Sequence, residues 1–572
     1  MGDPDNYRGL AIGSAFAKLF SAILLKRLLN YIVKNKLVSN KQIGFMKGSR
    51  TSDHIFLLQT IVEKVVKKNK AKLYAAFIDF KKAYDTVDRN KLFRRLNDLG
   101  INGFFYHNII AMYAKTRYSI KLKNGFLDPI DSNLGLKQGC PLSPMLFNLY
   151  IDDVKNIFDD QCEPVYLQDE KIHHFLYADD LVLVSHSADG LQRSLNKLSA
   201  YAKQKCLTIN TKKSNTMIFN LPGRHIKKQF NIEGKTLESV NTFCYLGFDV
   251  KSSGTVKHAM NTLNEKAKKA LRPLMCAVAR FNISPKTTMR LFHTFISPII
   301  LYNVENWGLM TDKKLENFTE MELFNETKES KTDIIHRKLL KRILGVSRSC
   351  PNISVYGETS EIPLSLKGFR LMLDYWNRLT NLPDESLAKK ALIENINLRT
   401  NWIKTIEKLV RTFKLLEAGN ANKQFKKATK ENISNYYKIS WKTKLADPDL
   451  IRLKVYQMIK KEFEPSKYLD LPQFELRQII AKIRCSDHAL EIEKGRHRNI
   501  LRGERICKTC TEGVIEDEEH FLLRCKTYQP LRNKHNMNAE NLNDFLNFEN
   551  QENLGKYLIS AFELRENILN TT

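Results

Sequence analysis

Two adjacent aspartates between two apolar runs constrain this chain more than any other stretch. Residues 175–184 are Phe-Leu-Tyr-Ala-Asp-Asp-Leu-Val-Leu-Val, a pattern typical of a strand, an acidic turn at Asp179 and Asp180, and a second strand. Two carboxylates at the tip of an apolar hairpin repel each other, and nearby apolar packing makes ionising both costly. A divalent cation removes that penalty. The hairpin therefore predicts a metal site, with an ordinary surface turn as the alternative because Asp is common in turns.

A second apolar run supplies a third carboxylate. Residues 73–78 are mostly apolar and end just before Asp79. A lone Asp at a strand end is commonly a cap or an ion-pair partner. Together with the hairpin, however, Asp79 could hold two divalent ions between neighbouring strands. Two ions about 3.5–4 Å apart clamp the attacking and leaving oxygens of a phosphoryl transfer. Mg²⁺, with Mn²⁺ as the alternative, suits so few carboxylates because substrate phosphates complete its ligands.

The charge of the chain predicts a polyanionic partner. Its 572 residues include 92 Lys and Arg against 62 Asp and Glu, a formal net charge of +30. That excess favours nucleic acid or an anionic membrane face. The sequence has no run of about 18 apolar residues, so we expect no membrane span. We also expect no secretory signal, and therefore reduced cysteines.

Four residues near the C-terminus have the spacing of a metal knuckle. Cys507, Cys510, His520 and Cys525 form the pattern C-x2-C-x9-H-x4-C. Three thiolates and one imidazole make a closed tetrahedral zinc set of the structural kind. The alternative is a chance arrangement of the four residues.

Two features beside this knuckle have plainer interpretations. The acidic run Glu516–Glu519 is expected to be a solvated turn. We expect His488 to be a spare metal ligand, a partner of a nucleic-acid phosphate or a core residue.

Six sequence blocks, in this order, resemble the reverse transcriptase of non-LTR (LINE-type) retrotransposons. The blocks are Gln42–Asp53, Phe77–Asp85, Gly135–Pro144, Tyr177–Asp180, Leu207–Ser214 and Tyr245–Gly247. The resemblance implies an α+β right-hand polymerase with fingers and an antiparallel palm sheet, a helical thumb, and a helical C-terminal region ending in a small zinc knuckle.

The resemblance and the helical periodicity together predict a series of domains. These are fingers and palm at 1–250, a helical thumb at 251–310, a linker or loop at 311–332, a basic helical region at 333–500, a CCHC zinc knuckle at 501–530 and a helical tail at 531–572.

The resemblance assigns the three aspartates to two Mg²⁺ ions and adds contacts to the nucleotide. Tyr84 would lie under the incoming sugar and select deoxynucleotides, with a packed core tyrosine as the alternative. Gln138 would touch the nucleotide, and Gly139 would let the backbone approach template or nucleotide closely.

Three basic residues complete the predicted site. Lys47 and Arg50, on a glycine-containing turn, could present cations to a triphosphate. Relatives usually have Arg where Met46 stands, and a solvated basic loop is the alternative. Lys213 matches the position of a lysine that, in the family, protonates the leaving pyrophosphate. The alternative is an ordinary solvated lysine.

The leading hypothesis is therefore an RNA-directed DNA polymerase that copies RNA from a primer 3′-hydroxyl, with target DNA as the primer. One alternative is a catalytically inactive, nucleic-acid-binding relic or adapted retroelement protein. Another is a palm-type RNA polymerase, which would use ribonucleotides. The expected partners are template RNA, primer or target DNA, and dNTPs, without a membrane. Endonuclease activity is expected to lie outside this chain, and we expect the protein in nucleus and cytoplasm.

Overall fold

The computed structural model describes residues 9–221, 224–308, 331–415 and 422–571. The predicted linker at 311–332 lies outside these ranges except for its last two residues, which belong to helix α12 (Lys331–Leu344). The chain forms two compact units. The first contains Met1–Ala259 and Arg378–Ile403, and the second contains Met260–Asn377 and Lys404–Thr572.

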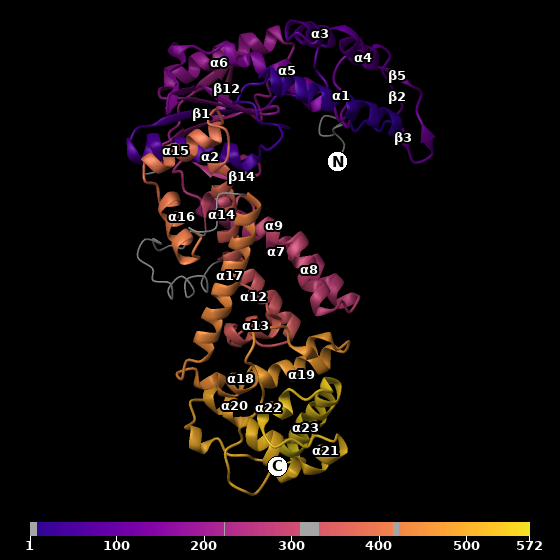
Figure 1. The fold of residues 1–572 in the computed structure, drawn as a ribbon, viewed down its shortest axis with the longest axis vertical. Helices are drawn as coiled ribbons and strands as arrows, with labels where there is room; N and C mark the ends of the chain where they lie inside the picture. Colours follow the sequence, from indigo (N-terminus) through magenta and orange to yellow (C-terminus); the bar gives the residue numbers. More distant parts are fainter. Residues whose placement is uncertain (1–8, 222–223, 309–330, 416–421, 572) are drawn as a thin grey trace. The chain divides into compact units, whose positions relative to one another are not determined.

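The first unit is organised around a mixed sheet. Among the described residues, six strands pair in the order β11-β12-β10-β1-β9-β8, with β1 near the centre (Figure 1). All neighbours are antiparallel except β10 and β12. The strands are β1 (Leu73–Ile78), β8 (His174–Tyr177), β9 (Asp180–Ser185), β10 (Asn215–Phe219), β11 (Phe230–Ile232) and β12 (Lys235–Ser239).

The two faces of this sheet bury alternate residues of the same strands. Figure 1 shows helix α6 (Ala188–Gln204) and helix α2 (Thr51–Val62) on opposite sides of β1. Ala76 and Ile78 pack in one core with residues of α6, while the ring of Phe77 stacks on Phe243 with centroids 4.3 Å apart. Because side chains alternate along a strand, apolar residues at consecutive positions indicate burial on both faces.

The remaining elements of the first unit surround this sheet. The helices are α1 (Ala15–Lys34), η2 (Glu63–Lys68), α3 (Arg89–Asp98), α4 (Gly103–Ala114), α5 (Ser143–Ile151), η3 (Asp152–Asn156), η4 (Asp160–Cys162) and α15 (Leu387–Asn397). Small ribbons pair β2 (Arg117–Tyr118) with β5 (Ile130–Asp131), β3 (Lys121–Leu122) with β4 (Gly125–Phe126), β6 (Val165–Leu167) with β7 (Glu170–Ile172), and β13 (Thr242–Tyr245) with β14 (Phe248–Lys251).

A segment far along the chain completes the first unit. Helix α15 packs on α2, and the Asn395 side-chain amide donates to Thr60 Oγ1 at 2.7 Å. The rings of Phe56 and Trp402 lie 4.9 Å apart. The predicted domain boundaries remain predictions. The structure adds that residues 378–403 fold with the N-terminal part of the chain.

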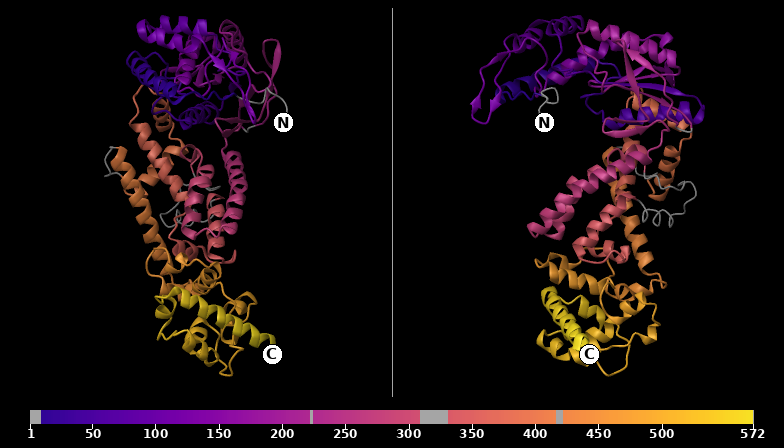
Figure 2. Two further views of the ribbon diagram at one scale, coloured as in Figure 1. Left: turned by 90° about the vertical axis from the view of Figure 1, so that its right-hand side faces the viewer. Right: turned by 180° about the vertical axis from the view of Figure 1, so that it is seen from behind.

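The second unit is built from helices (Figure 2). These are α8 (Pro285–Phe295), α9 (Ser297–Ile300), α10 (Val304–Trp307), α12, α13 (Asn352–Thr359), α17 (Asn422–Leu445), η6 (Ile451–Leu453), α18 (Lys454–Ile459), η7 (Lys467–Asp470), α19 (Phe474–Arg484), α20 (Glu491–His497), η8 (Arg502–Glu504), η9 (His520–Arg524), η10 (Lys526–Tyr528), α21 (Gln529–Lys534), α22 (Leu542–Leu546) and α23 (Gln551–Thr571). The chain passes between the units within α7 (Lys257–Arg280), α14 (Leu364–Thr380) and α16 (Asn401–Thr412). The predicted class, mixed α and β followed by a helical region, is confirmed.

Within the described ranges, no helix combines the length and apolar character needed to cross a bilayer.

A buried ion pair joins two helices of the second unit. Glu358 on α13 accepts hydrogen bonds from Arg484 on α19, the shorter at 2.9 Å, and both side chains are almost fully buried. Arg484 also donates to the carbonyl oxygen of Leu546 at 3.0 Å. Burial alone would raise the pKa of Glu358, but the neighbouring guanidinium holds that pKa below its usual value. Removing one partner of such a pair leaves an uncompensated buried charge.

We expect Glu358→Gln to lower the free energy of unfolding of this unit by about 3 kcal/mol or more. The readout is urea denaturation monitored by tryptophan fluorescence. Buried Trp441 on α17 lies beside Gly357, which is on the same helix as Glu358. The control is Glu462→Gln, which breaks a solvent-exposed pair with Lys442 and should change stability by at most about 1 kcal/mol. Equal effects of the two substitutions would contradict this prediction.

Candidate functional site

Asp79 directly follows the last residue of β1 and is fixed there by two polar side chains. Its backbone N–H donates to Ser214 Oγ at 3.1 Å, and the Asn210 side-chain amide donates to its Oδ2 at 2.8 Å. The Asn210 backbone N–H also donates to the Asp79 carbonyl oxygen at 2.8 Å. Both partners lie in the turn before β10, which pairs with β1. The pairing of these strands therefore positions the Asp79 carboxylate.

Ala178 and Asp179 form the turn of the acidic hairpin. Tyr177 pairs with Asp180 across the two strands, and Asp180 is the first residue of β9. Ala178 has φ of +58°, the left-handed conformation that tight hairpin turns require. The expectation that both aspartates occupy the tip is therefore wrong for Asp180, because its pairing with Tyr177 closes a two-residue loop.

Strand register places Asp79 and Asp180 next to each other. The pairing ends with Ile78 opposite Leu181. Asp79 follows Ile78 and Asp180 precedes Leu181, so the same register, continued by one residue, would oppose the two aspartates. Directly opposed residues have Cβ atoms about 4.5–5.5 Å apart and point to the same face. Asp179 lies one residue away in the turn. Among the described residues, the three carboxylates are not one of the groups whose ligand atoms all lie within 4.8 Å of one another. The strands thus bring the residues together, while the carboxyl groups stay more widely spaced than the ligands of one shared ion.

The charges of the aspartates act on one half-buried tyrosine, Tyr84, and one buried tyrosine, Tyr245. Burial, and then the charge of Asp179, raises the pKa of Tyr84. Burial and the charge of Asp180 likewise raise the pKa of Tyr245. Both phenols are therefore neutral at physiological pH. The negative potential around the aspartates favours a cation there.

The side chain of Gln42 is hydrogen-bonded to the backbone of the hairpin turn. Its side chain is 1% exposed, its Nε2 donates to the Ala178 carbonyl oxygen at 3.1 Å, and its Oε1 accepts from the Ala178 N–H at 2.9 Å. The same Oε1 accepts from the Gly44 N–H at 2.9 Å. A Cβ on Gly44 would lie 2.2 Å from the Ala178 nitrogen, so only glycine fits there. Residues 42–44 thus lock the turn that carries Asp179.

The predicted nucleotide-contact residues lie in two loops that touch. Tyr84 stacks on Phe147 with centroids 4.8 Å apart, and its buried hydroxyl has no hydrogen-bond partner. Gln138 donates to Asp85 Oδ1 at 2.8 Å. The neighbour of Gly139 is the backbone of Ala11, whose carbonyl oxygen would lie 2.7 Å from an added Cβ. The structure thus brings Tyr84 and Gln138 together through their loops.

The predicted basic residues are solvent-exposed and lie on different turns. Lys47 lines a cavity of about 180 Å³ together with Gly48, Asp53 and Arg378. Arg378 forms a forked pair with Asp53, with both N–O distances 2.7 Å, and so ties this turn to the returning segment 378–403. Arg50 precedes α2 as its N-cap residue.

Lys213 lies on the turn that fixes Asp79. Its backbone N–H donates to the Asn210 carbonyl oxygen at 3.0 Å, and its side chain is exposed.

Sequence reasoning assigned no role to Gln42, Asn210, Ser214 or Arg378. The first three lie inside or at the ends of motif blocks that were recognised. A buried polar side chain in such a block is the available signal, but its burial cannot be read from the sequence. Arg378 carries no local signal, because its partners are more than 300 residues earlier in the chain.

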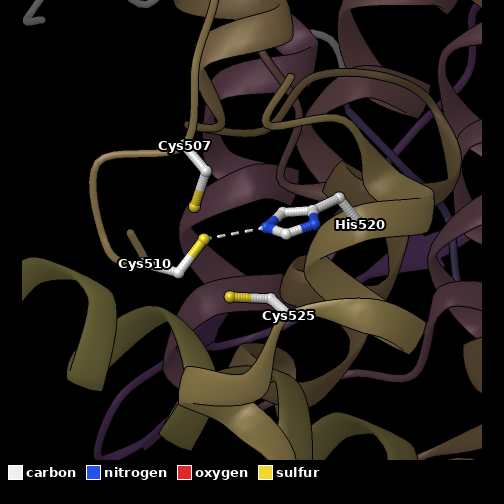
Figure 3. Close-up of side chains that lie close together, drawn as sticks. All are labelled: Cys507, Cys510, His520 and Cys525. Carbon is white, nitrogen blue, oxygen red and sulfur yellow. Dashed lines mark hydrogen bonds between the residues drawn. The ribbon is translucent and has the colours of Figure 1, made fainter. Parts of the chain in front are cut away.

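The four predicted knuckle residues come together in the second unit. The ligand atoms of Cys507, Cys510, His520 and Cys525 all lie within 4.8 Å of one another (Figure 3). Cys510 Sγ is 3.5 Å from His520 Nε2. Burial and the adjacent thiols raise the pKa of Cys510 to about 12, as expected where several thiols crowd together without a cation. This donor set could hold a metal ion, and three sulfurs with one imidazole suit zinc.

The acidic run beside the knuckle is not a solvated turn. Glu516 is fully buried and accepts hydrogen bonds from Arg565 of α23 at 2.6 and 2.7 Å. Glu518 is also buried and lies 3.0 Å from Nε2 of His488. That expectation was wrong because the arginine that compensates Glu516 is remote in sequence. His488 is a core partner of Glu518.

Comparison with known proteins finds similarity over most of the first unit. A family model described as reverse transcriptase (RNA-dependent DNA polymerase) matches residues 2–250. The chain is 24% identical over 322 residues to a probable RNA-directed DNA polymerase from transposon BS of Drosophila melanogaster, covering 54% of this chain and 34% of that protein. Residues 2–250 therefore match the reverse transcriptase family, and this relative is a probable RNA-directed DNA polymerase from a transposon.

Other relatives come from the R2 element. The chain is 26% identical over 314 residues to the retrovirus-related Pol polyprotein from type-1 retrotransposable element R2 of Nasonia vitripennis, covering 53% of this chain and 29% of that protein. It is 26% identical over 392 residues to the R2 protein of Popillia japonica, covering 66% and 51%. The chain therefore spans about a third to a half of the length of these relatives. Among solved structures, apo telomerase from Candida tropicalis matches with a TM-score of 0.34 and 12% identity, over 72% of this chain and 60% of that one.

We expect Cys510→Ser to remove one equivalent of zinc per chain and to make the C-terminal region easier to digest with protease. A closed site of this kind contributes its binding free energy to folding. The measurements are elemental metal analysis of zinc-replete protein and limited proteolysis. The control is Cys276→Ser, an exposed cysteine outside the cluster. Unchanged zinc content in Cys510→Ser would remove this site.

Proposed function

We propose that this chain is an RNA-directed DNA polymerase of a non-LTR retrotransposon, which extends a primer 3′-hydroxyl on an RNA template, with nicked target DNA as the primer. The reverse transcriptase domain and its relatives support this function. The single observation that carries it is the register of β1 with β9, which sets Asp79 beside the acidic hairpin. In this proposal the six-stranded sheet is the palm, helices within 251–310 are the thumb, and the fingers lie within 1–250.

Asp79, Asp179 and Asp180 would hold two Mg²⁺ ions. Asp79 directly after β1, Asp180 at the start of β9 and Asp179 in the turn would supply the few oxygen ligands that Mg²⁺ takes beside substrate phosphates. When bound, the two ions neutralise charge on the attacking and leaving oxygens of the phosphoryl transfer.

The chain's own residues supply positioning. Asn210 and Ser214 hold Asp79, and Gln42 holds the turn that carries Asp179. Carboxylates that are already oriented need no reorganisation during the reaction. The polar residues behind the site are therefore part of the proposed catalytic machinery, although they do not touch substrate.

The other predicted contacts have proposed roles around the nucleotide. Tyr84, rigid against Phe147, would clash with a ribose 2′-hydroxyl and so select dNTPs. Gln138, oriented by Asp85, and Gly139 would contact the nucleotide. The triphosphate would meet Lys47 and Arg50, and Lys213 would protonate the leaving pyrophosphate.

The excess of basic residues supports nucleic-acid partners for the rest of the chain. A net charge of +30 favours binding to phosphate backbones, with an affinity that falls steeply as salt rises. We propose that the helical region 333–500 follows the template and primer backbones, and that the knuckle helps to hold RNA or target DNA.

We expect Asp179→Asn to lower dNTP incorporation on a poly(rA)/oligo(dT) template by about 10³-fold or more, because a carboxylate that would hold the ions is lost. The control is Asp160→Asn, an exposed surface residue paired with Lys171, which should retain activity. Wild-type incorporation no greater than that of Asp179→Asn would end the polymerase proposal. Nucleic-acid binding without incorporation would instead favour the inactive, nucleic-acid-binding alternative.

We expect Gln42→Leu to lower kcat by about 10–100-fold with little change in the KM for dNTP. The substitution leaves the Ala178 and Gly44 N–H groups without their acceptor, and small displacements of catalytic groups are costly. The matched control is Gln192→Leu. The Gln192 side chain also both donates to and accepts from the backbone of one residue, Asn231. Asn231 lies on β11, at the edge of the sheet opposite to β8. Equal losses in the two variants, or none in Gln42→Leu, would rule out a positioning role.

A further inference from the structure

A second cluster of potential metal ligands lies in the helical unit, and the proposed polymerase function does not use it. His293 lies on α8, His336 on α12, and Glu361 in the loop between α13 and α14. One ligand atom from each lies within 4.8 Å of the others. Three elements spread over about 70 residues of sequence thus converge on one point.

The Glu361 carboxylate lies between the two imidazoles. Its Oε2 is 2.8 Å from His293 Nε2 and 3.5 Å from His336 Nε2. The two rings are 5.7 Å apart and inclined at 64°. An oxygen and two nitrogens that converge from different directions can share one cation.

His336 provides independent evidence that points to a ligand. Its side chain is 1% exposed, Nδ1 has no hydrogen-bond partner, and Nε2 has none beyond the long 3.5 Å contact with Glu361 Oε2. The ring is held flat against Phe292 at 5.3 Å, with an interplanar angle of 8°. A buried polar group without a partner costs free energy and calls for an explanation.

We propose that His293, His336 and Glu361 bind a transition-metal dication, with Zn²⁺ as the best fit, and that the ion ties α8 and α12 to the loop before α14. Two imidazoles and one carboxylate are ligands that Zn²⁺ accepts readily. Bound through Nε2 of His336, the ion would satisfy the buried nitrogen nearest the carboxylate. Three protein ligands leave a fourth position for water.

Lys367 on α14 gives the proposal a sharp consequence. Its Nζ lies 3.0 Å from His293 Nε2 and 3.5 Å from Glu361 Oε2. The ammonium group therefore contacts two of the three ligands and competes with a metal ion for them. Its side chain is about a quarter exposed, so it can turn outward. Removing the ammonium should tighten metal binding, whereas a cluster that is only an ion-pair network would gain no metal affinity.

The test uses the full chain carrying Cys510→Ser, so that zinc at the knuckle does not contribute. We expect this parent to bind one equivalent of Zn²⁺ in titrations against a competing chelator. Lys367→Met should tighten binding by about tenfold or more, and Glu361→Gln should weaken it by at least as much, as should His336→Asn. The control His258→Gln alters a histidine that lies 3.8 Å from one carboxylate, Asp249, outside both potential metal-binding groups found in the described residues. It should bind like the parent.

A spectroscopic measurement on the parent tests the site even if the variant at buried His336 fails to fold. Co²⁺ in this site should show ligand-field bands without thiolate-to-cobalt charge transfer, since no sulfur is among its ligands. Circular dichroism of each variant reports folding. No Zn²⁺ bound by the parent would overturn the proposal. So would equal affinities of the parent, Lys367→Met and a folded Glu361→Gln.

Discussion

Antiparallel pairing of β1 with β9 is the constraint on which the rest of the first unit depends. The pairing opposes Ile78 and Leu181 and so makes Asp79 and Asp180 neighbours. A shift of one residue would exchange the two faces of a strand, and here both faces are buried, against α6 on one side and against Phe243 and Tyr245 on the other. Apolar packing therefore fixes the register, and the register fixes which carboxylates meet.

Buried polar side chains refine what the strands set. Gln42 meets the backbone of Ala178 with both its donor and its acceptor, so its own burial costs little. Asn210 gives Asp79 two donors, its side-chain amide to the carboxylate and its backbone N–H to the carbonyl oxygen. These contacts join segments that are over 100 residues apart in sequence. The acidic centre is therefore held by the tertiary structure and not by the hairpin alone.

Local sequence patterns predicted the parts of the site that short segments determine. The apolar runs on either side of Asp179 and Asp180 predicted the hairpin, and the end of another apolar run predicted the place of Asp79. The pattern did not show that Asp180 belongs to a strand, because a two-residue loop can be placed at either of two positions. It did not show that Glu516 is buried, since the compensating Arg565 lies 49 residues away. Likewise, the docking of residues 378–403 depends on contacts such as Asn395 with Thr60, 335 residues apart.

The two clusters of potential metal ligands also differ in whether short sequence segments determine them. The sulfur-rich cluster closes within a short stretch, from Cys507 to Cys525, and its Cys-x-x-Cys pair is a recognisable local spacing. The second cluster needs α8, α12 and the loop before α14 to pack first, since His293 and Glu361 are 68 residues apart. Closing a longer loop costs more conformational entropy, so the apolar packing around Phe292 must supply the free energy that brings its ligands together. A metal ion bound there would therefore reinforce helices that are already packed, whereas an ion bound by the knuckle would link two stretches that lie close together in the sequence.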